Sequence, residues 1–154
     1  DILERKLLSY NYNEKINKIL NKQRKTYFNI VNNIDNSFYK LRQNVSKAVP
    51  VYSSIAIEFK TEKECKKFIE FMNINGIGFD VYCSHLIMDF DTFEKQQSWH
   101  ISNFPYNITN YKKTKCSKTK NLFQRVAWFN LSASLKSKHI KYIIKKLKEY
   151  QNEF

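Results

Sequence analysis

The segment from 49 to 64 limits the fold most strongly, because it joins a strand directly to a capped helix. Pro50 favours an extended backbone at the residue before it, and apolar and polar side chains alternate over the following nine residues. The apolar positions of that alternation are Val51, Ile55, Ile57 and Phe59. Thr61 and Glu64 then have the spacing of a capping box at the start of a helix. The sequence therefore predicts a half-buried strand followed at once by a helix.

The helix after this strand is predicted over 62–73, and its apolar residues fall on one stripe. That stripe consists of Cys65, Phe68, Ile69 and Met72. Gly76 comes directly after the helix, where a residue with positive φ commonly closes the last turn.

Periodicity predicts two further strands and two further helices. The strands are expected over 77–82 and 125–131. A final helix is expected after a cap at Ser134, with apolar positions at Leu135, Ile140, Ile143, Ile144 and Leu147. Near the start of the chain, Asn13 is the expected cap of a long helix that reaches Ile34, and Phe38 and Leu41 extend its pattern by one turn.

These elements predict one α+β domain over 1–154. The expected architecture is a small, mostly antiparallel three-stranded sheet with helices packed on one face, preceded by the long N-terminal helix. Within it, 1–42 is a connecting helix region and 49–154 is the α+β small domain. Residues 84–120 have no long regular pattern, and a loop of that length inside a compact domain is usually functional or ordered by a partner.

The chain is strongly basic, with 27 Lys and Arg against 14 Asp and Glu and a formal net charge of +13. Its cations are 23 lysines and only four arginines. Because arginine is the side chain that grips phosphate in two places, the lysine excess suits either a solvated surface or a site for a nucleotide-linked or phosphorylated molecule.

The cysteines and the hydropathy of the sequence indicate the cellular compartment and exclude some kinds of partner. Cys65, Cys83 and Cys116 are odd in number and lack paired spacing, which favours a reducing compartment and a cytoplasmic location. No apolar run approaches the roughly 18 residues of a membrane span, so no membrane partner is expected. No metal site is expected either, since the cysteines and histidines lack the spacing of zinc ligands.

Aromatic and lysine side chains alternate between 99 and 120. Stacking rings beside cations are the chemistry of a nucleotide or single-stranded nucleic-acid site, although the rings could instead pack onto the sheet. The residues of this possible anion- and nucleotide-binding site are Trp99, Tyr106, Tyr111, Lys112 and Lys113.

Four segments in sequence order match a known domain. They are the basic stretch Lys22–Tyr27 on the first helix, Val49–Tyr52 with its following helix that ends in Gly76-Ile77, the segment Val81–His85, and the closing strand and helix over 121–147. Together they resemble the small C-terminal domain of fold-type-I pyridoxal-phosphate enzymes, in particular the DegT/DnrJ/EryC1/StrS sugar aminotransferase family.

The resemblance implies the C-terminal portion of a sugar aminotransferase that forms one wall of the cofactor and substrate cleft. In that family the Schiff-base lysine, the acidic partner of the pyridine nitrogen and the phosphate cradle lie in a large preceding domain, which nothing here resembles. We therefore expect no catalytic residue in this chain, and pyridoxal phosphate only in the parent enzyme. The expected partners are the large pyridoxal-phosphate-binding domain, in the same or a separate chain, and a nucleotide-sugar.

By the same resemblance, Tyr82 and His85 face the cofactor cleft and are expected to bind substrate, and Arg125 is expected to hold a carboxylate or phosphate group. Each also fits an ordinary structural role: a satisfied tyrosine, a surface histidine and a solvated arginine.

Nucleic-acid binding by the loop at 99–120 is the alternative function, and it has a distinct signature. Several phosphates held by lysines release counterions, so the affinity for oligonucleotides should fall steeply as salt concentration rises. We expect the leading hypothesis to give weak binding without dependence on oligonucleotide length. Fluorescence anisotropy over a salt series measures both properties, and a steep, length-dependent slope would favour the alternative.

Overall fold

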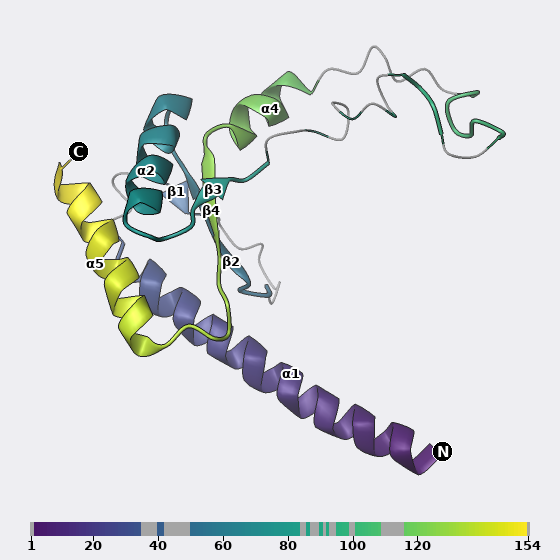
Figure 1. Cartoon of the computed structure of the whole chain (residues 1–154), viewed down its shortest axis with the longest axis horizontal. Helices are drawn as coiled ribbons and strands as arrows, with labels where there is room; N and C mark the ends of the chain where they lie inside the picture. Colours follow the sequence, from purple (N-terminus) through teal and green to yellow (C-terminus); the bar gives the residue numbers. More distant parts are fainter. Residues whose placement is uncertain are drawn as a thin grey trace.

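The structure, a computed structural model, describes residues 2–34, 40–41, 50–83, 86, 90, 92, 95–98, 101–108 and 116–153. Its elements in chain order are α1 (Ile2–Val31), β1 (Lys40–Leu41), β2 (Ser54–Glu58), α2 (Glu62–Ile74), β3 (Asp80–Val81), α4 (Ser117–Phe123), β4 (Val126–Asn130) and α5 (Ser137–Glu153). The strands form one antiparallel sheet in the order β1-β2-β4-β3. This arrangement confirms the predicted α+β class and the long N-terminal helix (Figure 1).

The sheet has four strands in the described residues, one more than the sequence predicts. Leu41, expected to extend the first helix, instead lies in β1 and pairs with Ile57 of β2. The helix has already ended at Val31, and a two-residue strand is too short to show an alternating pattern in the sequence. The pairing nevertheless satisfies backbone groups that would otherwise lie unpaired at the edge of β2.

One face of the sheet is covered by α2 and α5, and the C-terminal end of α1 packs beside them (Figure 1). The side chains at the centre of this core come from all of these layers and are almost inaccessible to water. They are Ile30, Ile55, Ile57, Cys65, Phe68, Met72, Ala127, Leu131 and Leu147. Since full burial of a large apolar side chain contributes about 1.5–3 kcal/mol, this layer supplies most of the stabilising energy.

The junction between β2 and α2 agrees with the prediction except at its first residue. The Thr61 hydroxyl accepts from the Glu64 backbone N–H, and the Glu64 carboxylate accepts from the Thr61 backbone N–H, so the capping box is present. Gly76 has a φ of +72°, as expected after the helix. Val51 was predicted on the buried face but is 64% exposed, because regular pairing begins only at Ser54.

The first helix differs from the prediction at its start. α1 runs without a break through Asn13, so that residue is not a cap. An asparagine inside a helix costs only a few tenths of a kcal/mol, which the surrounding residues outweigh. The C-terminal end of α1 is held by the amide of Gln23, which donates to the Leu131 carbonyl at 2.8 Å, and by buried Tyr27 and Ile30. The remainder of α1 extends away from the sheet (Figure 1).

The prediction of a cap at Ser134 is wrong, since α5 begins at Ser137. The hydroxyls of Ser132 and Ser134 pair with each other at 2.7 Å, and Ser132 Oγ also accepts from the Ser134 backbone N–H. At the actual helix start, Nδ1 of the exposed His139 accepts from the Lys136 backbone N–H. The serine hydroxyls therefore close a turn ahead of the helix instead of capping it.

The predicted absence of a regular pattern over 84–120 is also wrong in part. α4 covers Ser117–Phe123, with five polar residues before Leu122 and no buried side chain. A helix of seven residues without an apolar stripe shows no helical periodicity in the sequence. So short a helix is not stable by itself and depends on tertiary contacts, such as the contact of Phe123 with Tyr82 at its C-terminal end.

The capping box makes a measurable contribution to stability. Replacing Thr61 by alanine removes the acceptor of the Glu64 N–H, and we expect the free energy of unfolding to fall by about 1 kcal/mol. Thr61→Ser retains the hydroxyl and should unfold within a few tenths of a kcal/mol of the unmodified chain. Urea denaturation followed by circular dichroism measures both values, and equal losses in the two variants would contradict a role for the hydroxyl.

Candidate functional site

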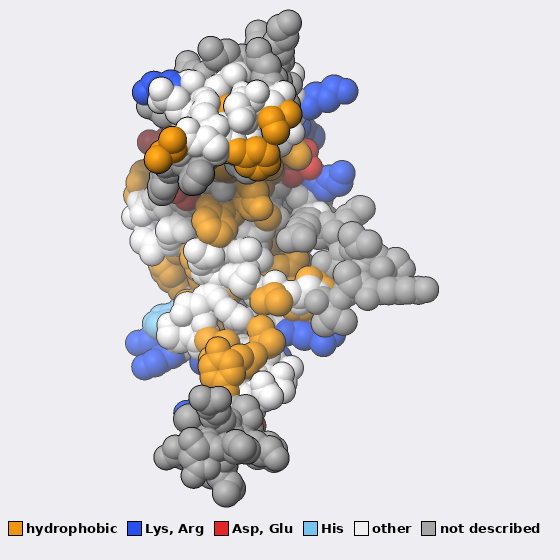
Figure 2. Space-filling model, turned by 90° about the vertical axis from the view of Figure 1, so that its right-hand side faces the viewer, with side chains coloured by type: hydrophobic (Ala, Val, Ile, Leu, Met, Phe, Trp, Pro, Cys, Tyr) orange, Lys and Arg blue, Asp and Glu red, His pale blue; other side chains and the backbone are white. Residues whose placement is uncertain are grey.

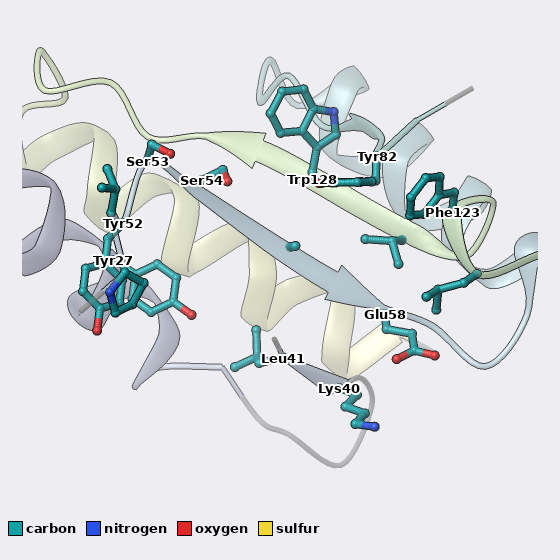
Figure 3. Close-up of a pocket in the computed structure, with 15 residues that line it drawn as sticks. Tyr27, Lys40, Leu41, Tyr52, Ser53, Ser54, Glu58, Tyr82, Phe123 and Trp128 are labelled. Carbon is teal, nitrogen blue, oxygen red and sulfur yellow. The ribbon is translucent and has the colours of Figure 1, made fainter. Parts of the chain in front are cut away.

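A groove of about 630 Å³ lies along the face of the sheet opposite α2 and α5 (Figure 3). Side chains alternate between the faces of a strand, so the burial of Ile55, Ile57 and Ala127 in the core turns their neighbours on β2 and β4 outward. The floor of the groove is formed by Ser54, Ala56, Glu58, Val126 and Trp128. A groove of this volume is in the range of small-molecule sites.

Three aromatic rings line one end of the groove. Tyr82, 48% exposed, packs edge-to-face against Phe123 with ring centroids 5.1 Å apart, and against Trp128 at 6.1 Å. The three side chains come from the segment after β3, from α4 and from β4. The final turn of α4 therefore has a function in the fold: it brings Phe123 to the open face of the sheet.

A second aromatic group closes the other end of the groove, where α1 meets the segment before β2. The rings of Tyr27 and Tyr52 lie 4.6 Å apart, and Phe28 is 5.0 Å from Tyr52. The guanidinium of Arg24 lies 6.0 Å from the Phe28 ring centroid. Both ends of the groove are thus aromatic, and polar groups lie between them.

Arg125 lies where β2, α4 and β4 meet, and its guanidinium bonds mainly to the protein itself. Nη1 donates to the carbonyl oxygens of Phe59 at 3.1 Å and Lys60 at 3.3 Å, and Nε donates to the Asn121 carbonyl at 3.3 Å. Nη2 lies 3.4 Å from a carboxylate oxygen of Glu58. These contacts tie the start of α2 to the end of α4.

The residues predicted to bind substrate or nucleotide are only partly described. Tyr82 lines the groove, whereas Arg125 is not among the lining residues and contacts one of them, Glu58. Tyr106 is half-buried in the segment 101–108 and is not among the residues that line the groove. The others lie outside the described residues: His85, Trp99, Tyr111, Lys112 and Lys113. Substrate binding by these eight residues stays a prediction.

Trp128 and Phe123 line the groove, although they are not among the site residues predicted from the sequence. The alternation of β4 contained the signal for Trp128, because a strand with Ala127 in the core must place its neighbour on the opposite face. Phe123 gave no such signal, since its position depends on where α4 ends.

Several groups with a shifted pKa lie on α2 and α5, across the sheet from the groove. Burial raises the pKa of the Cys65 thiol to about 11, with a further rise from the nearby Glu62 carboxylate. Burial also raises the pKa of Tyr150. A hydrogen bond between Lys146 and Glu149, 2.6 Å long, raises the lysine pKa and lowers the glutamate pKa. These shifts follow from packing and helix surface contacts, so they do not mark a reactive site at the groove.

Apolar and basic side chains are separated on the side of the molecule that faces away from α2 and α5 (Figure 2). Viewed from the side opposite α2 and α5, hydrophobic side chains run down the middle of the face, and most Lys and Arg side chains lie toward its edges (Figure 2). No helix in the described part of the chain is long and apolar enough to cross a membrane. Among the same residues, no cluster of His, Cys, Asp and Glu has the composition of a metal site.

Comparison with known proteins gives a family and a set of similar folds. A sequence model of the DegT/DnrJ/EryC1/StrS aminotransferase family matches residues 12–148. The fold is similar to Helicobacter pylori PseC, an aminotransferase involved in the biosynthesis of pseudoaminic acid, with a TM-score of 0.65 and 12% identity over 88% of this chain and 33% of that chain. No curated protein matches the chain significantly in sequence.

The fold is also similar to a putative sugar aminotransferase, Spr1654 from Streptococcus pneumoniae. Its apo form matches with a TM-score of 0.58 and 14% identity, over 87% of this chain and 31% of that chain. Its PMP form matches with a TM-score of 0.59 and 13% identity, over 88% and 31%. This chain therefore spans about a third of the length of the matched structures.

The family uses pyridoxal phosphate, and one matched structure is a PMP form. A lysine that reacts with this cofactor needs burial or a neighbouring cation to lower its pKa. Lys40, the lysine that lines the groove, is exposed, and the half-buried Lys146 is bonded to Glu149 on the other side of the sheet. Neither of these two lysines therefore has the environment that a cofactor lysine needs.

Arg125 is expected to stabilise the fold, whatever else it binds. Arg125→Met removes hydrogen bonds to three carbonyl oxygens and leaves Glu58 without its ion pair, so we expect a loss of about 2 kcal/mol in the free energy of unfolding. Arg125→Lys should recover only part of it, because an ammonium group lacks the planar fork of guanidinium. Urea denaturation measures the series. The matched control, Glu58→Gln, keeps the contacts with the carbonyl oxygens, so its free energy of unfolding should fall much less. If Arg125→Met were as stable as the unmodified chain, the fold would not need the guanidinium, and the prediction would be wrong.

Proposed function

The chain belongs to the DegT/DnrJ/EryC1/StrS aminotransferase family, and we propose that it is the C-terminal portion of a pyridoxal-phosphate-dependent sugar aminotransferase-like protein. In this proposal the open face of the sheet forms one wall of the cofactor and substrate cleft, and the chain is not catalytic on its own. The parent reaction transfers an amino group from glutamate to a keto-sugar.

The observation that supports this proposal most directly is the asymmetry of the sheet. A small sheet of this kind usually buries one face and presents polar side chains on the other. Here the second face carries Trp128, Tyr82 and Leu122 beside a groove of about 630 Å³. An apolar second face is typical of a surface that meets a ligand or another domain.

The partners proposed for this face are a large pyridoxal-phosphate-binding domain, in the same or a separate chain, and a nucleotide-sugar. This chain covers about a third of each matched structure. The remaining two thirds of such an enzyme are long enough to contain a large cofactor-binding domain. No disulfide joins Cys65, Cys83 and Cys116, all of which lie in the described part of the chain, and this suits the cytoplasmic location that we propose.

Nucleic-acid binding by 99–120 remains the alternative. Most of the residues that motivated it lie outside the described ranges, while α4 contributes the exposed Lys118 and Lys120 near the groove. The groove itself lacks an excess of positive charge, since Glu58 lies opposite Lys40 in the sheet. We therefore favour the aminotransferase proposal.

Reaction with pyridoxal phosphate tests whether a cofactor lysine is present in this chain. Exposed lysines form weak, unselective Schiff bases, so borohydride reduction followed by peptide mass spectrometry should find partial labels spread over many lysines. In the Lys40→Arg variant the label at residue 40 should disappear, and the labels on the other lysines should stay the same. Stoichiometric labelling of one lysine, with a saturable visible absorbance and transamination from glutamate, would show that the chain is catalytic on its own.

A further inference from the structure

The turn between α2 and β3 contains the chain's one asparagine–glycine pair, Asn75-Gly76 (Figure 1). Gly76 is exposed and Asn75 is half-buried. Asparagine is among the chemically labile residues of proteins, because the backbone nitrogen of the next residue can attack its side-chain amide carbon. A glycine in the next position has no side chain to obstruct that attack. The sequence therefore supplies the reacting groups of a spontaneous modification.

The reaction is a hydrolysis of the Asn75 side-chain amide in two steps. The Gly76 backbone nitrogen gives up its proton to water and forms a bond with Asn75 Cγ. The bond between Cγ and Nδ2 breaks, and the amide nitrogen takes up a proton from water and leaves as ammonia. Water then opens the five-membered imide at one of its two carbonyl carbons, which gives aspartate or isoaspartate. Each step needs only water and groups of the chain itself.

The folded chain holds both reacting groups in an unreactive arrangement. The Gly76 backbone N–H donates to the Asn73 carbonyl at 2.9 Å. The Asn75 side-chain amide donates to the Phe71 carbonyl at 2.8 Å. The backbone of Asn75 has a ψ of 13°, which turns the Gly76 nitrogen away from the Asn75 side chain. Because the imide ring needs both groups on the same side of the Cα–C bond, the last turn of α2 must open before the ring can close.

A hydroxyl group of α5 adds to this constraint. Tyr142 Oη donates to the backbone carbonyl of Asn75 at 3.1 Å. That carbonyl must rotate when ψ of Asn75 changes, so the hydrogen bond has to break before the imide ring can form. The packing of α5 against α2 therefore controls how often the turn at Asn75-Gly76 opens.

We infer that Asn75-Gly76 is a site of spontaneous deamidation, and that the closed end of α2 and its contact with Tyr142 set the rate. The product carboxylate lies at the C-terminal end of α2, where the helix dipole already carries partial negative charge, so it weakens the helix. Isoaspartate also adds a methylene to the backbone close to the buried Ile77, whose N–H donates to the Met72 carbonyl. The modification therefore loosens the link from α2 to β3. It is independent of the proposed function, since it concerns only the chain's own turn.

The test follows the whole chain near neutral pH, with peptide mass spectrometry to measure the mass increase of deamidation at residue 75. We expect the folded chain to react at least about tenfold more slowly than the same chain unfolded in urea, because opening the turn costs free energy. Urea concentrations below the unfolding transition should accelerate the reaction progressively, since they favour local opening. Asn73 is the internal control: it precedes the bulky Ile74 and should stay unmodified in the same samples.

A pair of variants tests the contact with α5. Tyr142→Phe removes the hydroxyl and keeps the ring, and the folded variant should deamidate about two- to fivefold faster, as expected for the loss of one hydrogen bond. Tyr12→Phe removes the hydroxyl of an exposed tyrosine on α1 and is the matched control, whose rate should not change. In urea the unmodified chain and both variants should react at the same rate. Circular dichroism verifies that each variant is folded.

Two results would overturn the inference as a whole. They are equal rates in the folded and the unfolded chain, and the absence of deamidation at residue 75 in both states. An unchanged rate in folded Tyr142→Phe would overturn the role of the hydroxyl. The urea series uses the unmodified chain, so it decides whether the closed turn protects Asn75 even if Tyr142→Phe fails to fold.

Discussion

Burial of one face of the sheet against α2 and α5 is the interaction on which the rest of the structure depends. Phe68 of α2 is at its centre, fully buried, and its ring lies 5.0 Å from Phe59, 4.9 Å from Phe79 and 5.1 Å from Tyr150. One ring thus contacts the segment after β2, the segment before β3 and α5. Because these segments come from distant parts of the chain, this contact sets which way the strands face.

The open face of the sheet follows from that choice. Once Ile55, Ile57 and Ala127 point into the core, the pleat of β2 and β4 places Ala56 and Trp128 on the other side. On that side of the molecule hydrophobic side chains gather along the middle and most Lys and Arg side chains lie toward the edges (Figure 2). Aromatic rings line the groove itself, and its Lys40 lies opposite Glu58 in the sheet. A strongly basic chain can therefore present a groove that is not itself basic, and net charge alone is a poor guide to the ligand.

The chain belongs to an aminotransferase family although its sequence is only weakly identical to those of the solved structures. The fold is retained at 12–14% identity because it depends on where apolar residues recur, and many apolar residues satisfy such a pattern. Other contacts join residues of different elements on or beside the open face. Trp128 beside Ala56, and Arg125 bonded to the carbonyl oxygens at the end of β2, are contacts that no periodic pattern describes.

The sequence by itself determined the α+β class, the strand followed by the capped helix, the turn at Gly76 and the apolar stripes of α2 and α5, because these depend on residues within a few positions of one another. Local signals misplaced the starts of α1 and α5, since Asn13 and Ser134 have capping side chains whose use depends on the surrounding structure. Only the tertiary structure decided that Leu41 pairs with Ile57, that α4 brings Phe123 to Tyr82, and that Trp128 lies beside Ala56. Those contacts join residues far apart in the sequence, and they form only when the shared core has fixed the register of the strands.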